Sequence, residues 1–585
     1  MNDLLASPAF ASTYQKYVDA KLLHQKHHSA NSPFEHLYEA RQHLLELKSI
    51  VEDFSGAEKH QILAVLDYHL GCNYANTEEG SQGEKLLTKS LEVLRPLASQ
   101  PSFVVIVIDA LNQLGTLWAG WDQDKKASAL LEEAEQLYTQ FTSGERQLPQ
   151  DPLVFPVVAH EDAVTSLEDA HTYTIYYLAQ IYGARQLTDK SAEYCRRTLD
   201  RQLKRSDLNK LTWALDCMTL SNYYTDINAY PMAYHCLAAS EQMLGAVDPK
   251  QYSGDGDDDD ENPIERAKAD LSWIWGKFYL AALDFGGQMK QESDFDRTVA
   301  ASTLDSPEAY DQAGVSLFKD FEVSYKRPKI PSSNILTYQQ ARDPFLEGLK
   351  CVSDAQKFFA FDGHVTDYVS LVQDMSQLYK ALSVFEEDPA RRLKLHKRRA
   401  ELVAPVLVEV SPVHYLPQTQ QLQFELAAAN EAMVDCRLVM WEAEHKSMVP
   451  ADRAVAADLI NELALASVRL YSDFITSFAD AQTRQLPDPI PDEDNLKSVM
   501  MARWKIARLW SRMIPVPSNK AVFDHVQLRE QKVEWLQRSL TQYERIKSYN
   551  SRHKIPGFDI EMQIIEEMCR LLPQQIKETR LGMDI

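Results

Sequence analysis

The stretch HLGCNYANTEEGSQGEKLLTKSLEVL, residues 69–94, decides the fold of this chain. This stretch has residues of defined size at fixed distances from Gly71, the second residue of a Leu-Gly pair. An aromatic residue follows three positions later, small residues follow 12 and 19 positions later, and a large residue follows 16 positions later. The residues concerned are Leu70-Gly71, Tyr74, Gly83, Ser90 and Leu87. We call this spacing the crossing pattern, because two antiparallel helices cross closely where both present small side chains. It is typical of tetratricopeptide repeats.

The crossing pattern recurs three more times before residue 241, with other small residues replacing most of the glycines. The copies are Leu114-Gly115, Trp118, Ala127, Leu131, Ala134; Leu178-Ala179, Tyr182, Ser191, Cys195, Thr198; and Leu220-Ser221, Tyr224, Ala233, Leu237, Ser240. A helix pair of this kind cannot bury its apolar face alone, so neighbouring pairs stack and form a long concave surface. The pattern therefore predicts a surface for binding other molecules and no catalytic pocket.

Composition agrees with an all-α fold. Of 585 residues, 45% are hydrophobic and 10% aromatic, which is enough for a continuous core, and only 19 are glycine. Leu, Ala, Glu and Gln are abundant, and they are good helix formers.

The net charge of −24, from 85 acidic and 61 basic residues, bears on the class of partner. It argues against nonspecific binding to nucleic acid, because neutralising phosphates needs a basic face. It favours partners with a basic surface, since opposite potentials steer encounter. The alternative is that the chain is an ordinary acidic protein.

The cysteines and the apolar segments indicate the compartment. The seven cysteines are scattered and form no CxxC pair, which is typical of a reducing compartment. The N-terminus lacks a basic region followed by an apolar run, so we expect no secretory signal. The most apolar stretch, residues 103–111, contains Asp109 and is too short to span a bilayer, so we expect a buried helix there and no membrane insertion. We predict a cytoplasmic protein.

The copies are separated by 44, 64 and 42 residues, and the long step implies an insertion that we place at the proline-containing residues 143–162. The acidic run 254–263 is predicted to be a solvated loop, since it lacks the glycine and the final glutamate of a calcium loop. We predict three regions: an N-terminal tetratricopeptide-like solenoid at 1–285, a linker region at 286–335 and a C-terminal helical half at 336–585. In the last of these, Leu426-Ala427 and Ile506-Ala507 look like further unit starts.

No motif predicts catalysis, and we expect no enzyme activity, no cofactor and no metal. Phosphate-binding glycine loops, a GxSxG elbow and an HExxH motif are all missing from the sequence. The histidines of residues 24–28 lack further ligands and are expected to be a solvated patch. Residues 362–364 (DGH) are expected to form a turn between helices, with His364 capping or packing. The basic run 394–399 is expected to be one solvated helix face.

Six stretches resemble the KIF-binding protein (kinesin-binding protein) family. They are HLGCNYANTEEG (69–80), YYLAQIY (176–182), AEYCRRTLDRQL (192–203), FFAFDGHVTDYV (358–369), FEEDPARRLKLHKRRAEL (385–402) and QLQFELA (421–427). The resemblance implies a right-handed α-solenoid in two halves joined by a linker helix. It implies binding to the motor domains of a subset of kinesins, which keeps them off microtubules and regulates organelle and axonal transport, including that of mitochondria in developing neurons. It implies no catalytic activity and no cofactor.

The resemblance also implies contact residues on the concave face of the N-terminal half. They are Tyr177 and Gln180 in YLAQ, Gln202 in RRTLDRQL and Thr219 in WALDCMTLSNYY. Each has a structural alternative: packing for Tyr177 and Thr219, a cap for Gln202 and a solvated position for Gln180. A C-terminal loop contacts the motor in the family, and the corresponding region here is about 441–453, where no residue can be transferred.

Two other functions remain open from the residues alone. The first is a general scaffold that grips linear peptides, although the repeats lack basic residues in register for binding carboxylates. The second is an enzyme with helical repeats as an accessory, which would need a strand-rich domain that we do not find. We expect the protein to be a monomer.

Overall fold

The computed structural model describes residues 17–20, 23, 34–53, 55, 59–143, 149–150, 160–205, 208–249, 262–295, 317–328, 330, 337–480, 482–516 and 525–582. These residues are mostly helical, and none of them lies in a strand. They fall into two compact units, Met1–Tyr223 with Ser316–Val323 and Tyr224–Val315 with Ser324–Ile585. The three regions predicted from the sequence stay a prediction.

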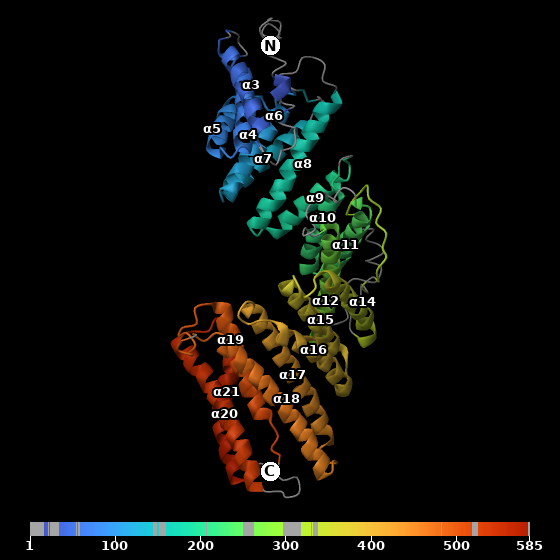
Figure 1. Cartoon of the computed structure of the whole chain (residues 1–585), viewed down its shortest axis with the longest axis vertical. Coiled ribbons are helices and arrows are strands. Elements are labelled where there is room, and N and C mark those ends of the chain that lie inside the picture. Colours follow the sequence, from blue (N-terminus) through green and yellow to red (C-terminus); the bar gives the residue numbers. More distant parts are fainter. Residues whose placement is uncertain are drawn as a thin grey trace. The chain divides into compact units, whose positions relative to one another are not determined.

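The first unit consists of consecutive helix pairs (Figure 1). Its helices are α3 (Glu35–Glu52), α4 (Lys59–Asn76), α5 (Gly80–Leu94), the short 3₁₀ helix η1 (Arg95–Leu97), α6 (Val104–Gly120), α7 (Asp124–Ser143), α8 (His160–Ala184), α9 (Thr188–Gln202) and α10 (Lys210–Asp226), in which the division between the units falls. Helix α4 packs on α5, α6 on α7 and α8 on α9, and the first helices α4, α6 and α8 also touch one another in order. The first helices thus form one layer of the unit.

The crossing pattern marks the points where paired helices approach most closely, as predicted. A Cβ atom added at Gly115 of α6 would lie 2.9 Å from Leu131 Cγ of α7, the large residue at offset 16. One added at Gly83 of α5 would lie 2.9 Å from the carbonyl oxygen of Gly71 of α4. In the third copy Ser191 Oγ of α9 donates to the Ala179 carbonyl oxygen of α8 at 2.7 Å. Small residues are therefore required by the backbone approach itself.

The apolar segment predicted as a buried helix begins α6 and lies in the core of the first unit. Val104, Val107, Ile108 and Leu111 are fully buried there. Asp109 within this segment accepts a hydrogen bond from the Tyr68 hydroxyl of α4. Burial raises the pKa of the Asp109 carboxyl, which lies among apolar neighbours.

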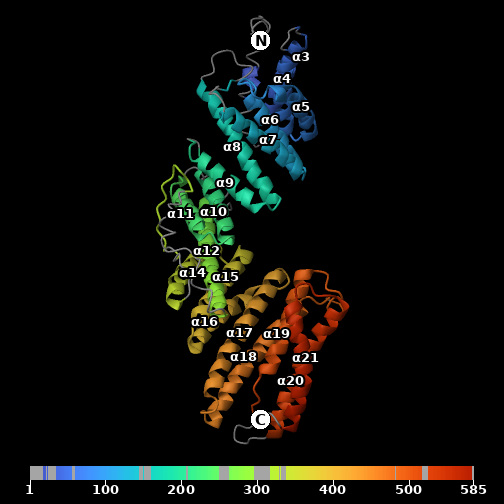
Figure 2. The same cartoon turned by 180° about the vertical axis from the view of Figure 1, so that it is seen from behind.

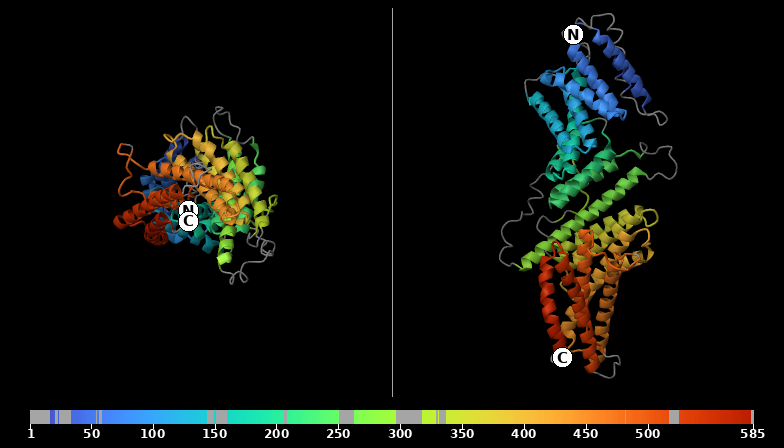
Figure 3. Two further views of the ribbon diagram at one scale, coloured as in Figure 1. Left: turned by 90° about the horizontal axis from the view of Figure 1, so that it is seen from below. Right: turned by 90° about the vertical axis from the view of Figure 1, so that its left-hand side faces the viewer.

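The second unit continues as antiparallel helices. They are α11 (Tyr230–Gly245), α12 (Pro263–Phe295), α14 (Tyr338–Phe358), α15 (Val365–Phe385), α16 (Pro389–Glu409), α17 (Leu416–Glu444), α18 (Pro450–Thr476), α19 (Glu493–Arg512), α20 (His525–Arg552) and α21 (Asp559–Leu581). Each packs on the next along the chain. Figure 2 shows α17 to α21 side by side from behind, and Figure 3 shows the same orange and red helices from another side.

The two further unit starts predicted in the C-terminal half are close crossings as well. Ser467 Oγ of α18 donates to the Ala427 carbonyl oxygen of α17 at 2.8 Å. Ser539 Oγ of α20 donates to the Ala507 carbonyl oxygen of α19 at 2.7 Å. A serine hydroxyl that donates to the carbonyl oxygen of an alanine on the paired helix thus recurs at crossings in both units.

The prediction for the basic run 394–399 was wrong in part. His396 and Arg399 of this run are buried, and only its other members are exposed or partly exposed. Arg399 Nη2 lies 2.7 Å from Glu425 Oε1 of α17, and its Nε donates to Ser376 Oγ of α15. Arg399 thus joins α16 to α15 and to the next helix, α17, whereas the exposed Lys397 and Arg398 pair with Glu401 of their own helix.

Residues 362–364 form the predicted turn between α14 and α15. Gly363 has a φ of +98°, a conformation that favours glycine. His364 lies at the N-cap position of α15, makes no side-chain capping bond there, and packs near the rings of Phe358 and Phe359. The histidines of 24–28, most of the insertion at 143–162 and the acidic run up to residue 261 lie outside the described residues.

Candidate partner-binding surface

Helix α8 carries two of the four contact residues predicted from the sequence. Tyr177 and Gln180 lie one turn apart, which places both on one face; Gln180 is exposed and Tyr177 half-buried. The Tyr177 ring packs near those of Tyr173 and Tyr176, with centroids 4.4 and 5.2 Å away. It also packs on the apolar cluster around Leu178. Tyr177 therefore fills the helix pair and still presents part of its ring to the surface.

Helix α10 carries the third residue. Its first turn is capped by Asn209, whose Oδ1 accepts from Thr212 N at 3.1 Å. The buried Trp213 fixes α10 against α9, since its Nε1 donates to the Leu199 carbonyl oxygen at 3.0 Å. Thr219 is exposed, and its hydroxyl donates to the Leu215 carbonyl oxygen of its own helix at 3.2 Å.

Asp216 of α10 lies near enough to Tyr176 of α8 to affect its hydroxyl electrostatically. Asp216 precedes Thr219 by three residues and shares its face of α10. Burial and the nearby Asp216 raise the pKa of the Tyr176 hydroxyl, and the Gln180 amide beside it acts in the opposite direction. We call Tyr176, Tyr177, Gln180, Asp216 and Thr219 the α8–α10 surface.

Gln202, the fourth predicted residue, is placed differently. It is the last residue of α9, the second helix of its pair. Its side-chain oxygen Oε1 is buried and has no hydrogen-bond partner among the described residues. A buried acceptor without a partner costs about 1–3 kcal/mol. The expected cap is therefore not made by this oxygen.

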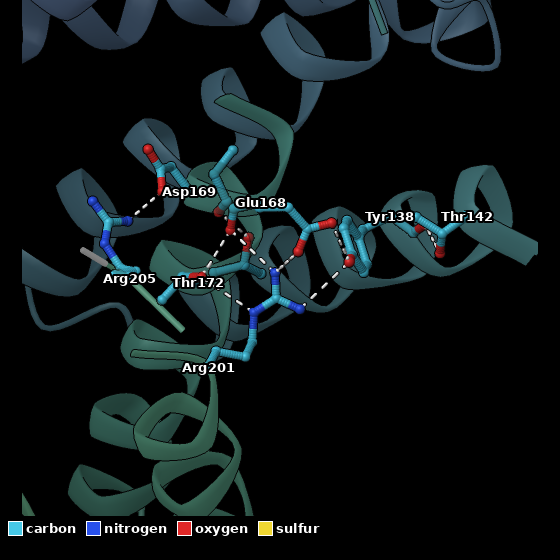
Figure 4. Close-up of polar contacts among 9 residues, drawn as sticks. Tyr138, Thr142, Glu168, Asp169, Thr172, Arg201 and Arg205 are labelled. Atoms are coloured by element: carbon cyan, nitrogen blue, oxygen red, sulfur yellow. Dashed lines mark hydrogen bonds and ion pairs between the residues drawn. The ribbon is translucent and has the colours of Figure 1, made fainter. Parts of the chain in front are cut away.

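A polar network holds the end of α9 on α7 and α8 (Figure 4). The Arg201 guanidinium binds the Glu168 carboxylate of α8 and donates from Nε to Thr172 Oγ1 at 3.2 Å. Tyr138 of α7 donates to Glu168 Oε1 at 2.9 Å. Arg205, just beyond α9, binds Asp169. These fixed charges set the position of α8, and hence of Tyr177 and Gln180.

The described residues contain no group of three or more His, Cys, Asp or Glu side chains that could hold a metal ion. Among them, no helix is both long and apolar enough to cross a bilayer. A surface of tyrosine, amide, hydroxyl and carboxylate groups is suited to recognising polar and cationic side chains of a protein.

Sequence reasoning missed Asp216 and Tyr176. The available signals were the adjacent tyrosines in YYLAQIY and the three-residue spacing of Asp216 and Thr219. Neither signal says that α8 and α10 bring these residues together, because that depends on the stacking of helix pairs.

Comparison with known proteins gives the family. A family model described as KIF-1 binding protein C terminal matches residues 211–579. The KIF-binding proteins of Gallus gallus and Homo sapiens are 31% and 30% identical, over 98% and 93% of this chain and 98% and 89% of theirs. That of Drosophila melanogaster is 25% identical over 94% of each chain.

A solved structure supports the fold. A cryo-EM structure of KIFBP superposes with a TM-score of 0.61 over 98% of this chain and 99% of that one, at 24% identity. This likeness and the helix pairs described above make the chain an all-α solenoid. The family model and the extent of identity lead to one conclusion: the chain belongs to the KIF-binding protein family.

Proposed function

We propose that this protein binds kinesin motor domains and prevents their attachment to microtubules, and so regulates organelle transport along the cytoskeleton. The observation that carries the proposal is membership of a family whose relatives are named for binding KIF proteins. The α8–α10 surface supports it, because three of the residues that the resemblance assigns to motor binding lie there and two of them are exposed.

Charge supports the same mechanism. The microtubule-binding face of a kinesin has to be basic, since tubulin is acidic. A partner with a net charge of −24 is attracted to that face and can compete for it. Attraction of this kind raises the association rate and selects partners more than it adds affinity, so we expect binding to weaken as salt rises.

The testing experiment is microtubule co-sedimentation of a panel of motor domains with and without the full-length protein. We expect a subset of motors to move from the pellet to the supernatant when the protein is added in excess. If no motor domain binds the protein at low salt, the proposal fails.

A surface variant locates the contact. In Gln180→Lys/Thr219→Lys both positions are exposed, so the fold should tolerate the change, and the two new cations should repel a basic motor. Gln140→Lys/Thr88→Lys makes the same chemical changes at exposed positions of the second helices α7 and α5. Release of motors should be lost with the first variant and kept with the second. Equal inhibition by both would show that the contact lies elsewhere.

A further inference from the structure

Asp216 is an unpaired carboxylate in the middle of the α8–α10 surface. Its side chain is half-buried, and no ion pair or hydrogen bond joins it to another described residue. Burial alone raises its pKa to about 6, and no cation nearby offsets that effect. Two acids of this unit show the usual compensation: the half-buried Glu135 pairs with Arg197 at 2.7 Å, and the buried Asp67 with Lys48 at 2.6 Å. Asp109, which has no ion pair among the described residues, accepts a hydrogen bond from Tyr68 instead.

An uncompensated charge of this kind is costly to the folded protein. Removing a carboxylate from water without a cation or donor beside it disfavours the charged form. Perturbed groups without a structural partner are typical of functional sites. A cation is the partner that a carboxylate pairs with most strongly, and this face of α10 is accessible to one, because Thr219 one turn along it is exposed. The Tyr176 hydroxyl lies nearby on α8, and the Thr219 hydroxyl donates to the Leu215 carbonyl oxygen, so neither neutralises the charge of Asp216.

We propose that Asp216, flanked by Tyr176 and Thr219, receives a lysine or arginine side chain from the microtubule-binding face of the kinesin motor domain. This inference rests on the proposed function and adds a residue and a chemistry to it. The pairing would be charge-assisted and partly shielded from water, so it would favour motors that carry a cation at the matching position.

The decisive comparison uses Asp216→Asn in the full-length protein, which keeps the shape and removes the charge. Glu92→Gln is the matched control, because Glu92 is an exposed acid on the second helix α5 and the net charge changes equally. We expect Asp216→Asn to weaken motor binding by about tenfold or more and Glu92→Gln to leave it within about twofold. Isothermal titration at one salt concentration measures both.

The pH dependence is an independent readout. Affinity of the unaltered protein should rise between pH 5 and 6.5 and then level off, because only the ionised Asp216 binds the cation. Tyr176 faces Asp216 from α8, and Cys195 of α9 lies near Tyr176; phenols and thiols titrate above this range. The difference between the unaltered protein and Asp216→Asn should therefore disappear near pH 5.

The outcomes separate the two proposals. If the unaltered protein binds no motor domain, the proposed function fails. If it binds and Asp216→Asn binds equally well at pH 7.5, the proposed function stands and the role of Asp216 is refuted.

Discussion

The imidazole of His171 in α8 stacks on the phenol ring of Tyr138 in α7, with centroids 3.5 Å and ring planes 9° apart. His171 is 3% exposed, and neither ring nitrogen has a hydrogen-bond partner among the described residues. Burial, with the cations Arg201 and Arg197 nearby, lowers its pKa to about 3. The ring therefore acts as a neutral packing group beside the Arg201 network.

This stack predicts acid sensitivity of the first unit. The unfolded chain takes up a proton at His171 near pH 6.5 and the folded chain only near pH 3, so folding free energy is lost as pH falls through this window. At pH 5 the loss is about 2 kcal/mol. His171→Phe should keep the stack and lack this loss, whereas His60→Phe, at an exposed position of α4, should retain it. Urea unfolding at pH 7.5 and 5.0 checks this, and an equal acid loss in all three proteins would contradict it.

The close crossing of α4 and α5 predicts that adding a methyl group at Gly71 lowers the stability of the fold. At Gly71 an added Cβ would lie 2.7 Å from Leu87 Cγ and 3.1 Å from Leu87 N, so the pair would have to separate. We expect Gly71→Ala to destabilise the fold by about 1–3 kcal/mol. Gly120, at the end of α6, has no atom within 4 Å of its added Cβ, so Gly120→Ala should be neutral or slightly stabilising. Thermal unfolding of both variants compares them, and a stable Gly71→Ala would show that the crossing can relax.

The buried pair of Arg399 and Glu425 predicts a large effect in the second unit. Their side chains are 3% and 12% exposed, and Glu425 also accepts from Gln377 at 2.8 Å. Glu425→Ala should cost about 3–5 kcal/mol because it leaves the Arg399 charge uncompensated. Glu534→Ala, which breaks the exposed pair with Arg538, should cost under about 0.5 kcal/mol.

Replacing both partners tests the physical reason for that loss. Arg399→Met/Glu425→Leu should recover most of the stability lost in Glu425→Ala, since neither charge then remains buried. The measurement is the denaturant midpoint of the unaltered protein, Glu425→Ala, Glu534→Ala and the double variant. If the double variant is as unstable as Glu425→Ala, packing rather than the unpaired charge explains the effect.

The raised pKa of Asp216 predicts that removing its charge stabilises the fold at neutral pH while it weakens motor binding. A carboxyl whose folded pKa lies above its unfolded value destabilises the fold once it ionises, so the penalty is present above pH 6 and disappears toward pH 4. Asp216→Asn should therefore melt higher than the unaltered protein at pH 7.5 and equally at pH 4, while binding motors less well. A lower melting temperature at pH 7.5 would contradict this.

The spacing of small residues along the sequence predicted where the two helices of a pair cross closely. The crossing pattern identified the close contacts of Gly83 with Gly71 and of Ser191 with Ala179, because these are set by residue size at fixed offsets. The alanines of the later unit starts, Ala427 and Ala507, were found for the same reason. Charge pairing between helices was not predictable in this way. Arg399 looked like a solvated residue because its partner, Glu425, lies on the next helix and at no fixed offset from it.

The candidate surface shows the same limit. The resemblance named Tyr177, Gln180 and Thr219, and the exposure of the last two fits a binding role without testing it. Asp216 was overlooked because a single acid in a helix has no distinguishing sequence context. Its isolation from cations becomes visible only when α8 and α10 are both in place.

The serine hydroxyls at the helix crossings have a mechanical consequence. Ser191, Ser467 and Ser539 each tie one helix of a pair to the other at hydrogen-bond length, so each pair should move as a rigid body. Any bending that accommodates a partner then has to occur at the junctions between pairs. Backbone amides at these junctions should exchange with deuterium faster than those at the crossings, and a bound partner should slow exchange mainly at the junctions.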